Sequence, residues 1–203
     1  VSGGEQPPAR NVEREQVTLI LDQDSYQFGD TAEILVQAPF SSGQGRLTIS
    51  RSGIVSSETF QMDGASHTLE IPIEEWQIPN LHLQVDLTGS APRTDDQGEV
   101  QTELPPRPAY ASGSLNLEIP PLSRSLNVEA VPRETELAPG QETSLNIRVV
   151  DASGEPVKDA ELAVVVVDEA ILALSGYTLT DPLEVFYADR PADFSTYYSR
   201  NFI

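Results

Sequence analysis

Catalysis by a side chain needs a base, a nucleophile or a bound metal, and this chain holds few candidates for any of them. The two histidines, His67 and His82, each occupy an outward-facing position of an expected strand, where a solvated surface histidine is the simplest interpretation. The sequence has no Gly-x-Ser-x-Gly elbow, Walker loop or dinucleotide fingerprint, and no pair of carboxylates has a reason to be desolvated. We therefore expect no catalytic residue, no cofactor-binding residue and no enzymatic activity.

A metal site is the other chemical possibility. Asp22, Asp24 and Asp30 cluster around one turn and could bind calcium through their oxygens. Their spacing lacks the EF-hand pattern, and aspartates favour turns because their side chains bond to the nearby backbone. We prefer this structural interpretation and expect no metal. The chain contains no cysteine, which excludes disulfides, thiolate metal sites and thioesters within its 203 residues.

Charge and hydropathy exclude further classes of partner. The chain carries 32 acidic and 12 basic side chains, a net charge of −20, whereas phosphate binding needs clustered Lys and Arg. The same charge disfavours adsorption to anionic lipid headgroups. The longest unbroken apolar run, residues 162–167, is far shorter than the ~20 residues that span a bilayer. We expect no nucleic-acid partner and no direct membrane insertion.

Alternating apolar residues between turn signals predict an all-β chain of immunoglobulin-like sandwiches. Residues 1–16 are expected to be a linker or tail, 17–121 one sandwich domain, and 122–203 the N-terminal part of a second, incomplete one. Trp76, the only tryptophan, is expected to fill the core between two sheets. The expected strands are 17–21, 31–37, 46–50, 58–62, 66–72, 82–87, 111–119, 126–130, 143–149 and 162–167.

The most distinctive stretch lies in the second domain. Residues 162–167 include four consecutive valines, which favour a strand, and the lack of alternation predicts that both of its faces are buried. A short helix should follow, with Asp168 as its N-cap, Glu169 as its first residue and Gly176 closing it in a left-handed conformation. Asp181 before a proline predicts a second capped helix over 182–188.

Two segments of the chain also resemble each other. Gly29 and Gly140 each close a turn, and the strands that follow them superpose when 111 is added to the residue number. A period near 100 residues is typical of tandem sandwiches. The match is short and is weak evidence by itself.

Several motifs together resemble the alpha-2-macroglobulin family, in its bacterial form. They cover most of the chain and stand in the family's order, and the Val-Asp-Glu-Ala segment is the most specific of them. The motifs are Asp24-x-Tyr26-x-x-Gly29-Asp30, Ala38-Pro-Phe40, Arg51-Ser-Gly-Ile-Val55, Ala163-Val-Val-Val-Val-Asp168-Glu-Ala-Ile-Leu-Ala-Leu174 and Asp181-Pro-Leu-Glu-Val-Phe-Tyr187.

This resemblance implies tandem macroglobulin-like domains of about seven strands each, placed just upstream of the bait region. Family members are broad-spectrum endopeptidase inhibitors that trap a protease after it cuts the bait, in many members through a thioester. Neither bait nor thioester motif is found in this chain. The implied role is a scaffold that supports the bait and relays its cleavage, with target proteases and neighbouring domains as partners, in a bacterial periplasm or cell envelope.

Other interpretations stay open at this stage. Strings of acidic sandwiches also build structural or adhesive modules of bacterial surface proteins. A carbohydrate-binding module would want exposed aromatic residues in a row, whereas the tyrosines group only at Tyr187, Tyr197 and Tyr198. The chain starts at Val1 without methionine and stops at Ile203 without a natural terminus, so we expect it to be part of a longer protein.

The first prediction concerns the residues that would anchor the bait: Asp168, Glu169, Gly176 and Asp181. If Asp168 caps the helix, Asp168→Ala removes an acceptor for the first-turn N–H groups and should lower the free energy of unfolding by about 1 kcal/mol. Thermal or denaturant unfolding measures this loss. An unchanged stability of the variant would show that Asp168 is not a cap.

Overall fold

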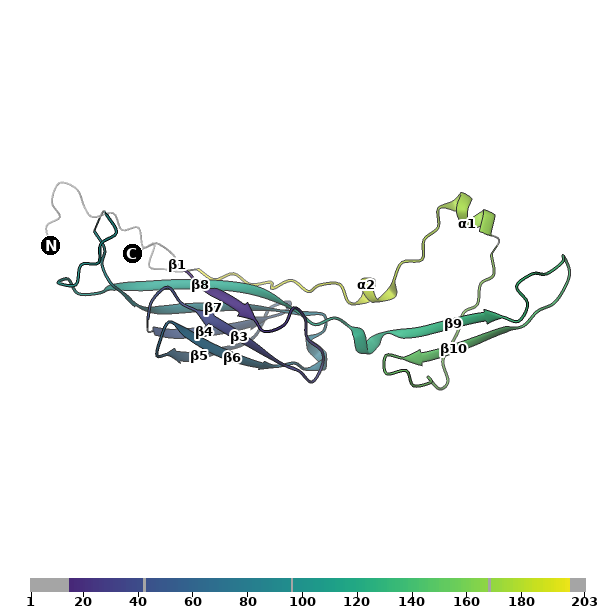
Figure 1. Ribbon diagram of the computed structural model, residues 1–203, viewed down its shortest axis with the longest axis horizontal. Coiled ribbons are helices and arrows are strands. Elements are labelled where there is room, and N and C mark those ends of the chain that lie inside the picture. The colour runs from purple at the N-terminus through teal and green to yellow at the C-terminus, as the bar shows by residue number, and fades with distance from the viewer. Residues whose placement is uncertain (1–14, 42, 96, 168, 198–203) are drawn as a thin grey trace. The chain divides into compact units, whose positions relative to one another are not determined.

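A computed structural model describes residues 15–197 of the chain except 42, 96 and 168 (Figure 1). The chain forms two compact units. The first combines the residues up to Pro120 with those from Asp189 onward, and the second is Pro121–Ala188. Residues 189–203 were expected in the second domain, whereas the described part of this segment groups with the first unit. Strands form most of the first unit and a two-stranded sheet of the second, which confirms the mostly-β fold.

The first unit is built from two sheets, and all pairings in them are antiparallel except that of β1 with β8. One sheet has the order β1-β8-β7-β4-β5 and the other the order β2-β3-β6. A single 3-10 turn, Glu75–Gln77, precedes β7. The strands are β1 (Glu15–Gln16), β2 (Thr18–Leu21), β3 (Thr31–Gln37), β4 (Gly43–Ser50), β5 (Ile54–Met62), β6 (Ser66–Pro72), β7 (Asn80–Ala91) and β8 (Arg107–Glu118).

The core of the first unit follows from strand alternation, since every second side chain of a strand points to the same face. Along β7, Leu81, Leu83, Val85 and Leu87 are buried, and the residues between them point outward. Trp76 was expected in this core, but it is 47% exposed and its indole N–H donates to Glu74 instead. That expectation was wrong, because smaller aliphatic side chains from the strands already fill the space between the sheets.

The second unit holds one two-stranded sheet, β9 (Leu126–Pro132) paired with β10 (Leu145–Asp151), and a 3-10 turn, Leu122–Arg124. The two expected helices are present as α1 (Glu169–Ser175) and α2 (Pro182–Phe186). No described helix is long and apolar enough to cross a membrane.

The buried strand expected at 162–167 is not formed, so this prediction was wrong. These residues have no regular secondary structure, and Val166 is 90% exposed. A strand buried on both faces needs neighbouring strands on its edges and cover above and below. Within the described part of the second unit the sheet has only two strands, and both of them pair with each other.

The internal repeat is confirmed at the level of hydrogen-bond register. Adding 111 to the partners Thr18↔Gln37 and Leu21↔Ile34 of the first unit gives Glu129↔Arg148 and Pro132↔Leu145, which are partners in the second. The connecting loops repeat in part, because two backbone bonds of the first loop have counterparts in the second. These bonds are Asp22 N to Glu33 O with Arg133 N to Ser144 O, and Asp30 N to Gln27 O with Gln141 N to Ala138 O.

Equivalent positions differ in burial between the two copies. Tyr26 and Ile34 are buried in the first unit, whereas their counterparts Leu137 and Leu145 are 45% and 41% exposed. In the first unit a five-stranded sheet covers this face. In the second, the described residues supply no second sheet, so the same pattern of residues stays in contact with solvent.

The aspartates considered as calcium ligands hold the turn between β2 and β3. Asp22 Oδ1 accepts from the Tyr26 hydroxyl at 2.6 Å and from Glu33 N at 2.9 Å, and Asp30 Oδ2 accepts from Gln27 N at 2.8 Å. The described residues include no cluster of three or more acidic or histidine side chains that could bind a metal. The turn interpretation of these residues therefore agrees with their contacts.

A test of packing uses two glycines of the first unit. A Cβ added to Gly113 in β8 would lie 2.3 Å from the backbone oxygen of Val17, so Gly113→Ala must push the chain between β1 and β2 away. We expect a loss of about 1–3 kcal/mol in the free energy of unfolding. Gly64→Ala is the matched control, because a Cβ there meets nothing within 4 Å. Equal stability of the two variants in urea would contradict this packing.

A second test uses the pH dependence of the Asp22–Tyr26 bond. The Tyr26 hydroxyl lowers the pKa of Asp22, while burial and then the Asp22 carboxylate raise the pKa of Tyr26 to about 12. The lowered carboxyl pKa adds stability that is lost as the pH falls through it. The raised phenol pKa adds stability that is present below pH 10.0 and lost as the pH rises toward about 12.

When the free energy of unfolding of Tyr26→Phe is measured against pH, the loss at high pH should disappear and the loss at low pH should shrink, since Glu33 N and Gln23 still lower the pKa of Asp22, and the variant should be less stable at neutral pH. The exposed Tyr177 gives the control, since Tyr177→Phe should keep both losses. A Tyr26→Phe profile that parallels the wild type would show that this bond does not link folding to pH.

Candidate functional site

The polar outward face of the five-stranded sheet carries the best-defined candidate site. Described residues 189–197, which we name the strap, return to the first unit and run along this face (Figure 1). The alternation that buries Leu81 and Leu83 turns Asn80 and His82 of β7 to the same outward face. The sheet thus presents polar side chains where the strap passes.

Residues 190–192, in the N-terminal part of the strap, are bound through their main chain. Arg190 N donates to Asn80 Oδ1 at 2.8 Å, and Arg190 O accepts from Asn80 Nδ2 at 3.1 Å and from His82 Nε2 at 2.7 Å. The next two carbonyls, of Pro191 and Ala192, accept from Ser52 N at 2.7 Å and Gly53 N at 3.0 Å. Four successive backbone groups of the strap therefore have partners on the sheet.

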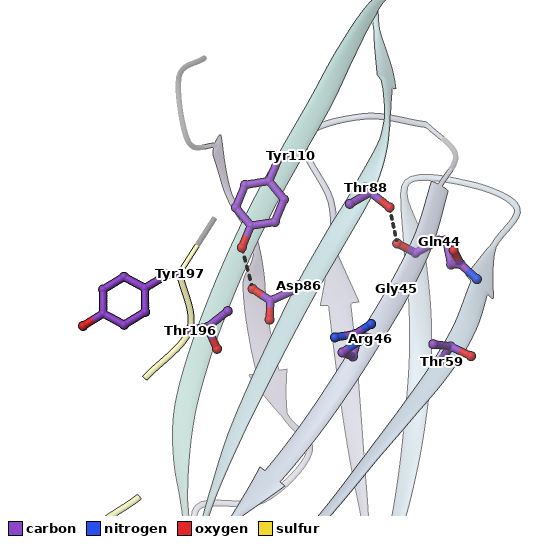
Figure 2. A pocket seen from close by; sticks show the side chains of 9 residues that line it. All are labelled: Gln44, Gly45, Arg46, Thr59, Asp86, Thr88, Tyr110, Thr196 and Tyr197. Atoms are coloured by element: carbon purple, nitrogen blue, oxygen red, sulfur yellow. Dashed lines mark hydrogen bonds between the residues drawn. The ribbon is translucent and has the colours of Figure 1, made fainter. Parts of the chain in front are cut away.

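The C-terminal part of the strap, at Thr196 and Tyr197, borders an open pocket of about 220 Å³ (Figure 2). Tyr110 donates from its hydroxyl to Asp86 Oδ1 at 2.8 Å, and Gln84 Nε2 donates to both oxygens of the same carboxylate. These neutral donors satisfy Asp86 without a cation. The pocket is lined by Gln44, Gly45, Arg46, Thr59, Asp86, Thr88, Tyr110, Thr196 and Tyr197.

This arrangement can hold a polypeptide and polar groups, because it offers hydrogen-bond donors and acceptors along a strand. His82 lies on the outward face as expected, but its Nε2 donates to the strap rather than to solvent. No signal in the sequence brings Ser52, Gly53 or Asn80 together with residues 190–192, which follow them by more than 100 positions. Sequence reasoning missed these residues for that reason.

The described relay residues Glu169, Gly176 and Asp181 belong to the second unit, whereas this site belongs to the first. Asp168 lies outside the described residues, and Glu169 is the first residue of α1. Gly176 follows α1 with a φ of 61°, in the left-handed region. Asp181 caps α2 by accepting from Leu183 N at 2.8 Å, which confirms the predicted cap. Their part in a relay stays a prediction.

Comparison with known proteins identifies the family of the chain. The model of the alpha-2-macroglobulin bait region domain matches residues 17–174. The chain is 25% identical over 181 residues to Circularly permutated Ras protein 2 of Dictyostelium discoideum, covering 89% of this chain and 4% of that protein. It is 24% identical over 181 residues to an alpha-2-macroglobulin homolog of Nostoc sp., covering 88% of this chain and 9% of that protein.

A solved structure agrees with the fold. The crystal structure of a Salmonella alpha-2-macroglobulin mutant superposes with a TM-score of 0.50 at 21% identity, covering 89% of this chain and 11% of that one. The chain thus spans only a small part of the relatives it matches. Since one family model matches residues 17–174, well over half of the sequence, the chain belongs to the alpha-2-macroglobulin bait region domain family.

Proposed function

We propose that the chain is a scaffold segment of a broad-spectrum endopeptidase inhibitor that traps proteases after its bait is cut. The observation that carries this proposal is the match of residues 17–174 to the bait region domain. The chain supports the bait and relays its cleavage, and neither reacts with the protease nor acts as an enzyme. Its partners are the target proteases, met through the full-length protein, and the neighbouring macroglobulin-like domains.

We place the chain just upstream of the cleaved segment, with 17–121 as one macroglobulin-like domain and 122–203 as the N-terminal part of the next. The register shared by β2–β3 and β9–β10 supports this division, because the second copy starts the same sandwich again. The bacterial relative from Nostoc supports a bacterial type of protein, for which a periplasmic or envelope location is part of the proposal.

The relay is the finer part of the proposal. Its residues are Asp168, Glu169, Gly176 and Asp181. Of the described ones, Glu169 begins α1, Gly176 follows it and Asp181 caps α2, and in this proposal the two short helices lead toward the bait. A cut in a nearby loop can be felt at a distance only if the elements next to it have defined positions, since packed domains switch between discrete arrangements. The cap at Asp181 gives one such defined point.

The test treats the full-length protein with trypsin and follows its mobility on a native gel. We expect the cut protein to become more compact and to retain the protease. Trypsin with a blocked active site is the control, because it cannot cut the bait and should cause no change. Fragmentation without compaction would overturn the proposal and favour the structural or adhesive module.

The relay has its own variant pair in the same assay. Asp181→Ala removes the cap of α2 and should reduce the fraction of cut molecules that become compact, whereas cutting itself continues. Glu184→Ala changes an exposed carboxylate in the first turn of the same helix and should behave as the wild type. Equal compaction of the two variants would remove Asp181 from the relay while leaving the inhibitor proposal in place.

A further inference from the structure

The strap is recognised through its main chain and not through its side chains. All five hydrogen bonds that join residues 190–192 to the sheet use backbone N–H or C=O groups of the strap. Pro191 fits this pattern. Its backbone C=O accepts a hydrogen bond at this position, and the N–H that proline lacks is not needed there. A site of this kind selects an extended backbone and tolerates different side chains.

Asn80 has a second partner on the sheet besides the strap. Asn80 is fully buried, and its amide orientation is set by a bond from Nδ2 to Asn116 Oδ1 at 2.8 Å in the neighbouring strand. His82 lies two residues further along β7, on the same face. Because a carbonyl only accepts, His82 Nε2 must carry the proton of its bond to Arg190 O.

The third partner is a tight turn after β4. Arg51 N donates to Gly53 O at 2.8 Å, and Ser52 and Gly53 have φ values of 51° and 119°. A positive φ is unusual for serine and persists only where the surroundings hold it, as at binding sites. In this turn the two successive N–H groups both point to the strap, where they meet two successive carbonyls.

Side-chain charge works against the contact. Burial, and then the positive charge of Arg190, lower the pKa of Arg51. The positive charge of Arg190 thus opposes that of Arg51, so attraction between these two side chains does not hold the strap. The backbone bonds hold the strap despite this repulsion.

We infer that Ser52, Gly53, Asn80 and His82 form a clamp for the main chain of an extended polypeptide, and that its ligand is the chain's own segment 189–193, which it shields from proteases. The clamp also lies where the chain leaves the first unit and where it returns to it. Ile119 N, where the chain leaves, donates to Pro79 O at 2.7 Å, and Arg190, where it returns, is bound by the adjacent Asn80.

The clamp does not rest on the proposed function, and its tests use the 203-residue chain alone. The first test is amide hydrogen exchange of Ser52 and Gly53, whose N–H groups are bound by the strap. Arg190→Pro removes the N–H that Asn80 accepts, and it lies outside the sandwich, so the fold should survive. We expect exchange at Ser52 and Gly53 to become about tenfold faster, as the loss of about one hydrogen bond implies.

Two control variants separate loss of the backbone N–H from loss of side-chain charge and from a general change in the sheet. Arg190→Gln keeps the N–H and removes the charge, so protection should stay or increase. Gln84→Ala removes an outward-facing side chain of β7 that bonds to Asp86, and protection should be unchanged. Equal exchange in the wild type and Arg190→Pro, or an equal loss in Arg190→Gln, would overturn recognition through the main chain.

Shielding is tested with an endoprotease that cuts before aspartate. Asp159, Asp189 and Asp193 are all exposed, but only the last two flank the backbone that the clamp binds, so cleavage before them in the wild type should be slow relative to cleavage before Asp159. Asn80→Ala should speed the first two cuts about tenfold and leave the third unchanged. If Asn80→Ala does not fold, His82→Ala on the half-exposed neighbour replaces it with the same expectation. Equal rates in wild type and variant would overturn the shielding.

Discussion

A β-strand is stable only when its edges have hydrogen-bond partners and its apolar side chains are covered, and this requirement explains both units. In the first unit, β3 lies between β2 and β6 and its apolar face is buried against a second sheet. In the described part of the second unit, β9 is the one strand that pairs with β10, whose other edge has only an isolated bridge from Val150 to Pro156, and the apolar side chains of both strands reach solvent. The same local pattern of apolar residues thus forms part of a closed core in one unit and of a solvent-exposed sheet in the other, depending on whether a second sheet covers it.

The internal repeat shows this most directly, since the two copies differ in cover and agree in local structure. Strand register, two backbone bonds of the loop and the left-handed glycines Gly29 and Gly140 recur at an offset of 111. Local sequence is therefore enough to specify a hairpin-like pair and its crossing loop. Burial is not specified locally, because it depends on strands that are distant in the sequence.

The strap shows a different use of the same chemistry. Its backbone groups bond to side chains and to a strained turn, so it is bound to the sheet face without becoming a strand of the sheet. Such binding is weaker than incorporation into a ladder, because a few bonds replace a continuous row.

By itself, the sequence determined the fold class, most strands of the first unit, the two short helices with the cap at Asp181, the repeat, and the family resemblance. Each of these depends on periodicity, turn chemistry or motifs within a few residues. The tertiary structure alone decided that Trp76 lies outside the core and that residues 162–167 are exposed. It also decided that Asn80 and His82 meet Arg190. The physical reason is that burial and long-range hydrogen bonds depend on which distant segments of the chain lie beside a residue. A run of four valines has the same sequence whether or not neighbouring strands cover it.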